Sequence, residues 1–254
     1  MNVGADVMSK NRILYAEKIA EAVSFLKMSG NKELIEHSDE VAQIARMILK
    51  DTKSFNLLQD EKMQTALKYM NLDTLADLYE LHDLGKIFIP DEILNKPGRL
   101  TDQEFKYVRR HPENTKKILD HIFPDKQSEP VQILYDTIML ISREHHENYD
   151  GTGYPRHLKG NEISTLGRIA RVSDVISALM GHRCYNREFN SFEAIANYLI
   201  KNKGVLFDPA IVDIVTTSKK TNKNIVTKEN LLNVFDIQNE INKIILKKIS
   251  NHGR

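Results

Sequence analysis

The chain has 254 residues, of which 41% are hydrophobic and 28% charged, and its formal net charge is +1. This length is enough for one large domain with a sizeable core. A net charge so close to zero argues against a polymeric nucleic acid as partner, since such binding needs a strongly basic surface. There is no signal-peptide pattern and no apolar run of membrane-spanning length, so we expect a cytoplasmic protein without a membrane span.

The spacing of apolar residues predicts the elements. Apolar residues recur at intervals of three and four from Ile13 to Leu26 and from Leu34 to Ile48, as in amphipathic helices. The same spacing continues at 72–84, 102–122, 130–141, 165–179 and 192–200. Thr101 and Ser191 are suited to be N-caps. Period-two alternation is nearly absent, so the sequence predicts an all-α fold.

The last part of the chain has a different composition. Residues 219–254 carry eight Lys or Arg against three Asp or Glu, and their apolar residues predict one more amphipathic helix. We expect this helix to pack against the core or a partner protein, with contact to a membrane surface as the minority alternative. The predicted organisation is an N-terminal helical segment that packs on the core at 1–30, a main domain at 31–217 and a basic C-terminal helical extension at 218–254.

Nine histidines are present, and several have neighbours that suggest chemistry. His82-Asp83 ends a helical stretch and is followed by Gly85, which can break the helix and leave Lys86 beside the pair. A lysine at this place can neutralise a phosphate oxygen. A His-Asp dipeptide alone is weak evidence, because it is common by chance.

Two further motifs place histidines at helix ends. His111 precedes Pro112 in a helical stretch, where proline is costly, so we expect His111 at a break or in a first turn. An exposed histidine at a helix start is an equally frequent alternative. His145 and His146 are adjacent, and adjacent helix positions do not share a face, so both can reach one site only near a helix end. The acidic, glycine-bearing turn from Asp150 supplies that end.

Carboxylates complete the candidate set. Asp174 lies in an apolar helical stretch, where a metal ion would offset the cost of burying its charge; a salt-bridged or partly exposed Asp is the more frequent explanation. Glu33 and His37 project from one helical face, a spacing also common in solvated helices. The only cysteine is Cys184, so any metal must be held by nitrogen and oxygen. Such a set suits two or three divalent ions, Fe or Mn, better than structural zinc.

The order of these motifs resembles the HD-GYP family. HD-x-G-K from His82, HP at His111, HHE-x-x-DG-x-GYP from His145 and a later helical Asp occur in the family's order. The resemblance runs from about Glu33 to Pro209 and includes IPDEILNKPGRLT, LKGNEI and FDP. It implies an HD-domain helical bundle and a bacterial signalling phosphodiesterase that hydrolyses cyclic di-GMP to linear pGpG, with GMP following where the site admits the linear dinucleotide.

The resemblance also implies roles for single residues. The implied metal ligands are His37, His82, Asp83, His111, His145, His146 and Asp174, and Glu33 matches the extra carboxylate of members that hold three ions. Asp83 is implied as the catalytic bridging carboxylate, and Lys86 as a catalytic and substrate-binding lysine that contacts phosphate. The implied remaining substrate contacts are Tyr154, Arg183 and Tyr185.

Three positions depart from the family's pattern. Ser177 stands where a second Asp is usual after the metal Asp, Asn186 replaces a basic residue, and Thr115 replaces a glycine. These changes leave the ligands intact but bear on the substrate. Two alternatives therefore stay open: a related hydrolase of another cyclic dinucleotide or phosphoester, and a non-catalytic dinucleotide-binding effector. The sequence also leaves open a homodimer or a regulatory protein partner.

Overall fold

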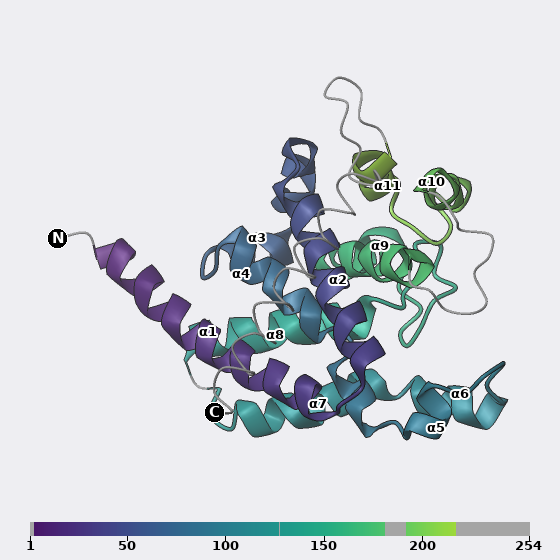
Figure 1. Cartoon of the computed structure of the whole chain (residues 1–254). Helices are drawn as coiled ribbons and strands as arrows, with labels where there is room; N and C mark the ends of the chain where they lie inside the picture. The colour runs from purple at the N-terminus through teal and green to yellow at the C-terminus, as the bar shows by residue number, and fades with distance from the viewer. Residues whose placement is uncertain (1–2, 127, 181–191, 217–254) are drawn as a thin grey trace, which may run out of the picture.

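The computed structural model describes residues 3–126, 128–180 and 192–216, and within them the secondary structure is helical (Figure 1). The prediction of an all-α fold is confirmed. The α-helices are α1 (Val3–Met28), α2 (Lys32–Lys50), α3 (Glu61–Leu67), α4 (Leu72–Asp77), α5 (Asp91–Leu94), α6 (Asp102–Val108), α7 (His111–Ile122), α8 (Glu129–Glu144), α9 (Thr165–Met180), α10 (Phe192–Lys201) and α11 (Pro209–Thr216). Short 3-10 helices are η1 (Thr52–Gln59), η2 (Leu78–Leu81), η3 (Leu84–Phe88) and η4 (Gly160–Glu162).

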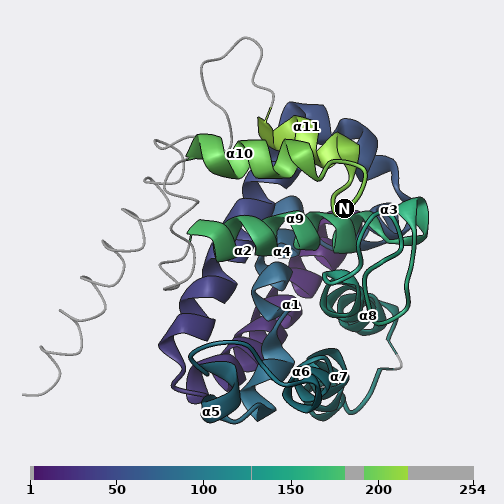
Figure 2. The ribbon, with the colours of Figure 1, turned by 90° about the vertical axis from the view of Figure 1, so that its right-hand side faces the viewer.

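The core lies around the contact between α2 and α9, which pack side by side (Figures 1 and 2). On α2 the buried apolar positions include Val41, Ile44 and Ile48, at the spacing that places them on one face. Burying each such side chain stabilises the fold by about 1.5–3 kcal/mol. α8 covers α9 and η2, while α4 and η2 pack on α2. This packing fixes the relative position of helices that are far apart in the sequence.

The helix α1 packs across η2, η3, α4 and α7. Tyr15 and Leu26 of α1 are fully buried, and the Tyr15 hydroxyl donates a hydrogen bond to the carbonyl of Pro130 at 2.9 Å. The division at residues 30 and 217 stays a prediction, and the proposed C-terminal extension lies outside the described residues. Among the helices that the structure describes, none is long and apolar enough to cross a bilayer.

The stretch 72–84, predicted as one helix, is interrupted in the structure. α4 ends at Asp77 and the chain continues through η2 and η3, with His82 and Asp83 between them. Gly85 in η3 explains the close packing that follows, because a Cβ there would lie 1.9 Å from the carbonyl oxygen of His111. The tight turns therefore bring Asp83 against the start of α7.

The stretch 102–122 is also divided, here as the proline predicts. α6 ends at Val108, and α7 begins at His111 with Pro112 in its first turn, where proline costs no helical hydrogen bond. Thr101 caps α6 in a capping box with Glu104, which confirms that N-cap. The other predicted N-cap, Ser191, lies outside the described residues.

Candidate metal centre

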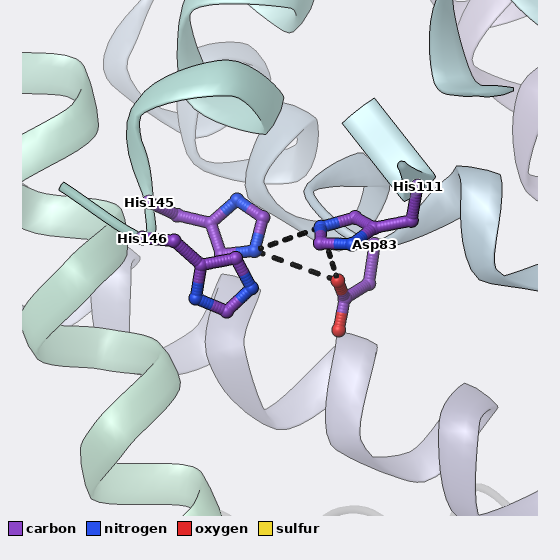
Figure 3. A group of neighbouring side chains, drawn as sticks. All are labelled: Asp83, His111, His145 and His146. Atoms are coloured by element: carbon purple, nitrogen blue, oxygen red, sulfur yellow. Dashed lines mark hydrogen bonds and ion pairs between the residues drawn. The ribbon is translucent and has the colours of Figure 1, made fainter. Parts of the chain in front are cut away.

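Imidazoles and a carboxylate from separate helical elements meet at one buried point (Figure 3). The ligand atoms of Asp83, His111, His145 and His146 lie within 4.8 Å of one another. His145 caps the C-terminus of α8, so both adjacent histidines reach the site from a helix end, as their spacing predicts. Figure 3 shows the rings of the pair directed at His111 and Asp83. We call these four residues the α7/α8 group.

A second group shares the same carboxylate. His37, His82 and Asp83 also bring ligand atoms within 4.8 Å of one another. The Nε2 atom of His37 lies 3.1 Å from Oδ1 of Asp174, so α9 contributes a carboxylate at this side. We call His37, His82, Asp83 and Asp174 the α2/α9 group. Asp83 is common to both groups, which is the arrangement expected of a bridging carboxylate.

The other candidates have different positions. Lys86 is 16% exposed, and its Nζ contacts Oδ2 of Asp83. The Tyr154 ring stacks on His146 with centroids 4.6 Å apart. Glu33 is exposed in the first turn of α2 and belongs to neither group, so its role as a ligand stays a prediction. Arg183 and Tyr185 lie outside the described residues.

Backbone carbonyls orient three of the imidazoles. Nδ1 of His82, His111 and His145 lies 2.9 Å from the carbonyl oxygen three residues earlier in each case. A carbonyl oxygen can only accept a hydrogen bond, so each Nδ1 carries the hydrogen. In the neutral ring the lone pair is then on Nε2, which faces Asp83. Histidines that ligate metals commonly donate their other N–H to a carbonyl or carboxylate in this way.

Side chains, not carbonyls, orient His37. Its Nδ1 lies 2.9 Å from the Ser177 hydroxyl, and that hydroxyl donates a hydrogen bond to Glu40 at 2.6 Å. Because the serine hydrogen is directed at the carboxylate, the serine oxygen accepts from Nδ1 of His37. The lone pair of His37 is therefore also on Nε2. Ser177 is 1% exposed and thus contacts a candidate ligand from a buried position.

In the centre, hydrogen-bond acceptors therefore face one another: imidazole Nε2 lone pairs and the carboxylate oxygens of Asp83. The Nε2 atoms of His111 and His145 are 3.4 Å apart, and they lie 3.3 and 3.5 Å from Oδ1 of Asp83. Nε2 of His82 and Oδ1 of Asp83 are buried without a hydrogen-bond partner among the described residues. Buried lone pairs in this arrangement are costly unless a proton or a cation lies between them. The donor set therefore fits divalent metal ions.

The charged neighbours decide the protonation of the carboxylates. Burial raises the pKa of the Asp83 carboxyl, but Lys86 and His82 outweigh it and hold that pKa well below its usual range. Burial acts in the same direction at Asp174, where the electrostatic attraction of His37 outweighs it and holds the pKa well below normal. Both carboxylates are thus ionised at neutral pH, as metal binding requires.

The imidazoles differ from one another. Burial lowers the pKa of His111 to about 3, against the attraction of Asp83, and burial also takes the pKa of His146 well below its usual value. At His82 burial again lowers the pKa, but the negative charge of Asp83 outweighs it and raises that pKa. His111 and His146 therefore offer neutral nitrogen ligands at neutral pH.

The loop after the histidine pair is fixed by a buried carboxylate and a glycine. Glu147 is 1% exposed and accepts hydrogen bonds from the backbone N–H groups of Arg156 and Leu158 at 2.7 and 3.1 Å. A Cβ on Gly153 would lie 2.5 Å from the carbonyl oxygen of His146, so only glycine allows the loop to fold back there. This return places Tyr154 on the His146 ring.

Thr115, which replaces a glycine of the family's pattern, has a defined structural role. Its hydroxyl accepts hydrogen bonds from the backbone N–H of Gly85 at 2.9 Å and from the Ser142 hydroxyl at 3.1 Å. It also lies 3.2 Å from the carbonyl of His111, to which it donates. One buried hydroxyl thus joins η3, α7 and α8, the three elements that carry the α7/α8 group.

Sequence inspection did not identify the contacts of Ser177, Glu40 and Glu147 with the site. For Glu147 a signal exists, because it belongs to the HHE motif. For Glu40 no local signal exists, since its partner Ser177 is 137 positions away.

Comparisons with known proteins agree with this geometry. A sequence model of the HD domain family matches residues 28–211. The cyclic di-GMP phosphodiesterase response regulator RpfG of Xanthomonas campestris is 42% identical over 133 residues, which are 52% of this chain and 33% of that protein. A cyclic di-GMP phosphodiesterase of Thermotoga maritima is 36% identical over 149 residues, 59% of this chain and 38% of that protein.

A relative with another named substrate is also similar. The 3′3′-cGAMP-specific phosphodiesterase 2 of Vibrio cholerae is 36% identical over 143 residues, 56% of this chain and 26% of that protein. The matched part is thus about a third of the length of these curated relatives. The similarity concerns one region of longer proteins.

Proposed function

The chain belongs to the HD domain family, and we propose that it is a metal-dependent phosphodiesterase that hydrolyses a cyclic dinucleotide, with cyclic di-GMP as the first candidate. Its relatives are named for hydrolysis of cyclic di-GMP or 3′3′-cGAMP, which supports this substrate class. The expected product is linear pGpG, with GMP as a second product. A cytoplasmic location is part of the proposal.

The observation that carries the proposal is the set of Nε2 lone pairs around Asp83. Four imidazoles have Nδ1 engaged outside the centre, and their Nε2 atoms face carboxylate oxygens. A purely structural cluster would satisfy these atoms with hydrogen-bond donors. Their arrangement instead supports bound divalent cations.

We infer two ions, one in each group, with Asp83 shared between them. His111, His145 and His146 would hold one ion, and His37, His82 and Asp174 the other. The nitrogen and oxygen donors suit Fe or Mn. When bound, such ions act as Lewis acids on a phosphate and supply a nucleophile at neutral pH.

The chain's own residues would position the substrate. Lys86 contacts the shared carboxylate from the edge of the centre and would share its charge with a phosphate oxygen. Tyr154 covers the His146 ring and fixes its plane, which keeps that imidazole directed at the centre. Lys86 and Tyr154 would thus help to hold the phosphodiester at a defined distance from the metal ligands.

The test is hydrolysis of cyclic di-GMP and 3′3′-cGAMP by protein purified without oxygen and loaded with Fe(II) or Mn(II). We expect chelator-sensitive formation of linear dinucleotide, separated by chromatography. The variant His145→Gln should be inactive, while His121→Ala, on the exposed side of α7, should match the unchanged protein. A metal-loaded protein that leaves both dinucleotides intact would contradict the proposal.

A further inference from the structure

Exposed aromatic side chains gather at one corner of the molecule, beside the metal centre. Phe105 and Tyr107 of α6 are 47% and 42% exposed, and Phe88 at the end of η3 is 51% exposed. The Tyr107 hydroxyl donates a hydrogen bond to the carbonyl of Phe88 at 3.3 Å, so these segments adjoin. Figure 1 shows α6 at the edge of the fold, next to α5. Of these three rings, that of Phe105 meets the Tyr154 ring beside the metal centre, and an exposed ring in such a place can mark a binding site.

One face of α6 continues the ring stack that begins in the metal centre. Tyr154 stacks on His146, and the Arg109 guanidinium lies over the Tyr154 ring at 4.1 Å. The Phe105 ring meets Tyr154 edge to face at 6.5 Å, and Arg109 lies 5.6 Å from its centroid. Arg109 is the C-cap residue that follows α6, four positions after Phe105, and therefore lies on the same side of this helix. The stack thus leads from a candidate ligand to the surface.

Arg109 has the character of a ligand contact. It forms no ion pair with any residue in the described part of the chain, and the contacts that hold it are the two aromatic rings. A guanidinium plane can stack on a nucleobase and can donate hydrogen bonds to the acceptor edge of a purine. Together with the Phe105 ring it offers a flat, cationic surface.

We propose that Phe105 and Arg109 form a stacking shelf for a purine base of the cyclic dinucleotide whose phosphate lies at the metal centre. The inference rests on the proposed function and adds a base-binding site to it. One ribose separates a phosphate from its base, and one ring, that of Tyr154, separates the shelf from His146. Stacking tolerates different bases, so guanine and adenine both fit the shelf.

The chain contains no tryptophan, so one introduced indole reports on the shelf without background. We would titrate the Phe105→Trp variant with cyclic di-GMP in manganese-loaded protein that also carries Lys86→Ala to slow turnover. Saturable quenching of the indole is expected. Tyr107→Trp is the matched control, because this residue is exposed on the same helix but is two positions away and faces elsewhere. Inorganic phosphate, which has no base, should quench neither variant.

Kinetics give an independent readout. In the protein with Lys86 intact, Phe105→Ala and Arg109→Ala should each raise KM for cyclic di-GMP about tenfold with kcat nearly unchanged, the loss typical of one stacked base. Tyr107→Ala should leave both constants unchanged. Equal effects of Phe105→Ala and Tyr107→Ala would overturn the shelf.

The outcomes separate the two proposals. Quenching of Phe105→Trp without any hydrolysis by the unchanged protein would support the shelf and contradict the phosphodiesterase. Hydrolysis with an unquenched indole and unchanged kinetics of Phe105→Ala would support the phosphodiesterase and overturn the shelf. Absence of both hydrolysis and quenching would overturn both.

Discussion

The α7/α8 group and the α2/α9 group share Asp83 but are held by different kinds of contact. His111 and His145 donate Nδ1–H to carbonyls three residues earlier, within their own segments. His37 depends on the Ser177 hydroxyl, which comes from a helix 140 positions later. Local backbone geometry thus orients His111 and His145 of the first group. In the second group it orients His82 as well, but the orientation of His37 depends on the packing of α2 against α9.

This difference indicates where each group is vulnerable. A carbonyl contact survives most side-chain substitutions nearby, because it needs only the local helical turn. A contact between side chains of two helices is lost when either side chain changes or the helices shift. We therefore expect mutations to affect the two groups separately, except at Asp83.

The largest effect is expected at the shared carboxylate. Asp83→Asn removes the charge common to both groups and should lower hydrolysis more than about a thousandfold, because residues that act as a unit fail together. Metal analysis after gel filtration should show that both ions are lost. If the Asp83→Asn variant kept one ion per chain, Asp83 would serve as a ligand in only one of the two groups, and the proposed sharing would be wrong.

A backbone contact tests the α7/α8 group. Gly85→Ala would place a methyl group within 1.9 Å of the His111 carbonyl oxygen and 2.5 Å of the Thr115 nitrogen. η3 and α7 must then move apart, and we expect a loss of about 3 kcal/mol of unfolding free energy. Chemical denaturation measures this loss. Gly98→Ala is the control for added volume, since nothing lies within 4 Å of that position, although its φ of 114° adds strain of its own.

A single hydroxyl tests the α2/α9 group. Ser177→Ala leaves the His37 Nδ1–H without its acceptor, and loss of such an orienting contact typically weakens metal binding about 10- to 100-fold. The loss should concern one of the two ions, visible as biphasic metal titration. Ser173→Ala, a buried serine of the same helix whose hydroxyl has no hydrogen-bond partner among the described residues, is the matched control. Equal weakening of both ions would show that the groups are not independent.

The smallest effect concerns the pH dependence of the stability of the metal-free protein. The sign of this dependence differs between His111 and His82. His111 has a pKa lowered from 6.5 to about 3, so the unfolded chain takes up its proton first and stability is lost as the pH falls through this range. His82 has a raised pKa, so its contribution is present below pH 6.5 and is lost as the pH rises through the folded value.

Substitution should separate these signs. For each variant we compare the unfolding temperature with that of the unchanged protein, in chelator. When the pH falls from about 8 to about 5, this difference should shift upward for His111→Gln and downward for His82→Gln. Thermal unfolding followed by circular dichroism measures both. The same pH dependence in the two variants would contradict the assigned directions.

The sequence predicts much of the fold because helical spacing is a local property. In α2 the apolar positions Val41, Ile44 and Ile48 indicate both the helix and its buried face. The 3-10 turns around His82 are not predicted by spacing, because they depend on the close approach of Gly85 to α7. That approach is a tertiary contact, which a single sequence does not display.

The same distinction applies to the site. Motif order predicts that His111, His145 and Asp83 converge, and the structure brings them together. The interaction between Glu40 and Ser177 could not be predicted, since neither residue belongs to a local pattern with the other. Ser177 replaces a family carboxylate, but its contact with His37 follows only from the packing of α2 on α9.

The long separation between His37 and Ser177 also bears on how the protein folds. Loops of this length close slowly, because many conformations must be lost before the contact is made. The α2/α9 group therefore cannot assemble until α9 has been synthesised and has docked on α2. Loading of the ion that this group would hold therefore follows the docking of α9 on α2, so chain topology sets the order of these two events.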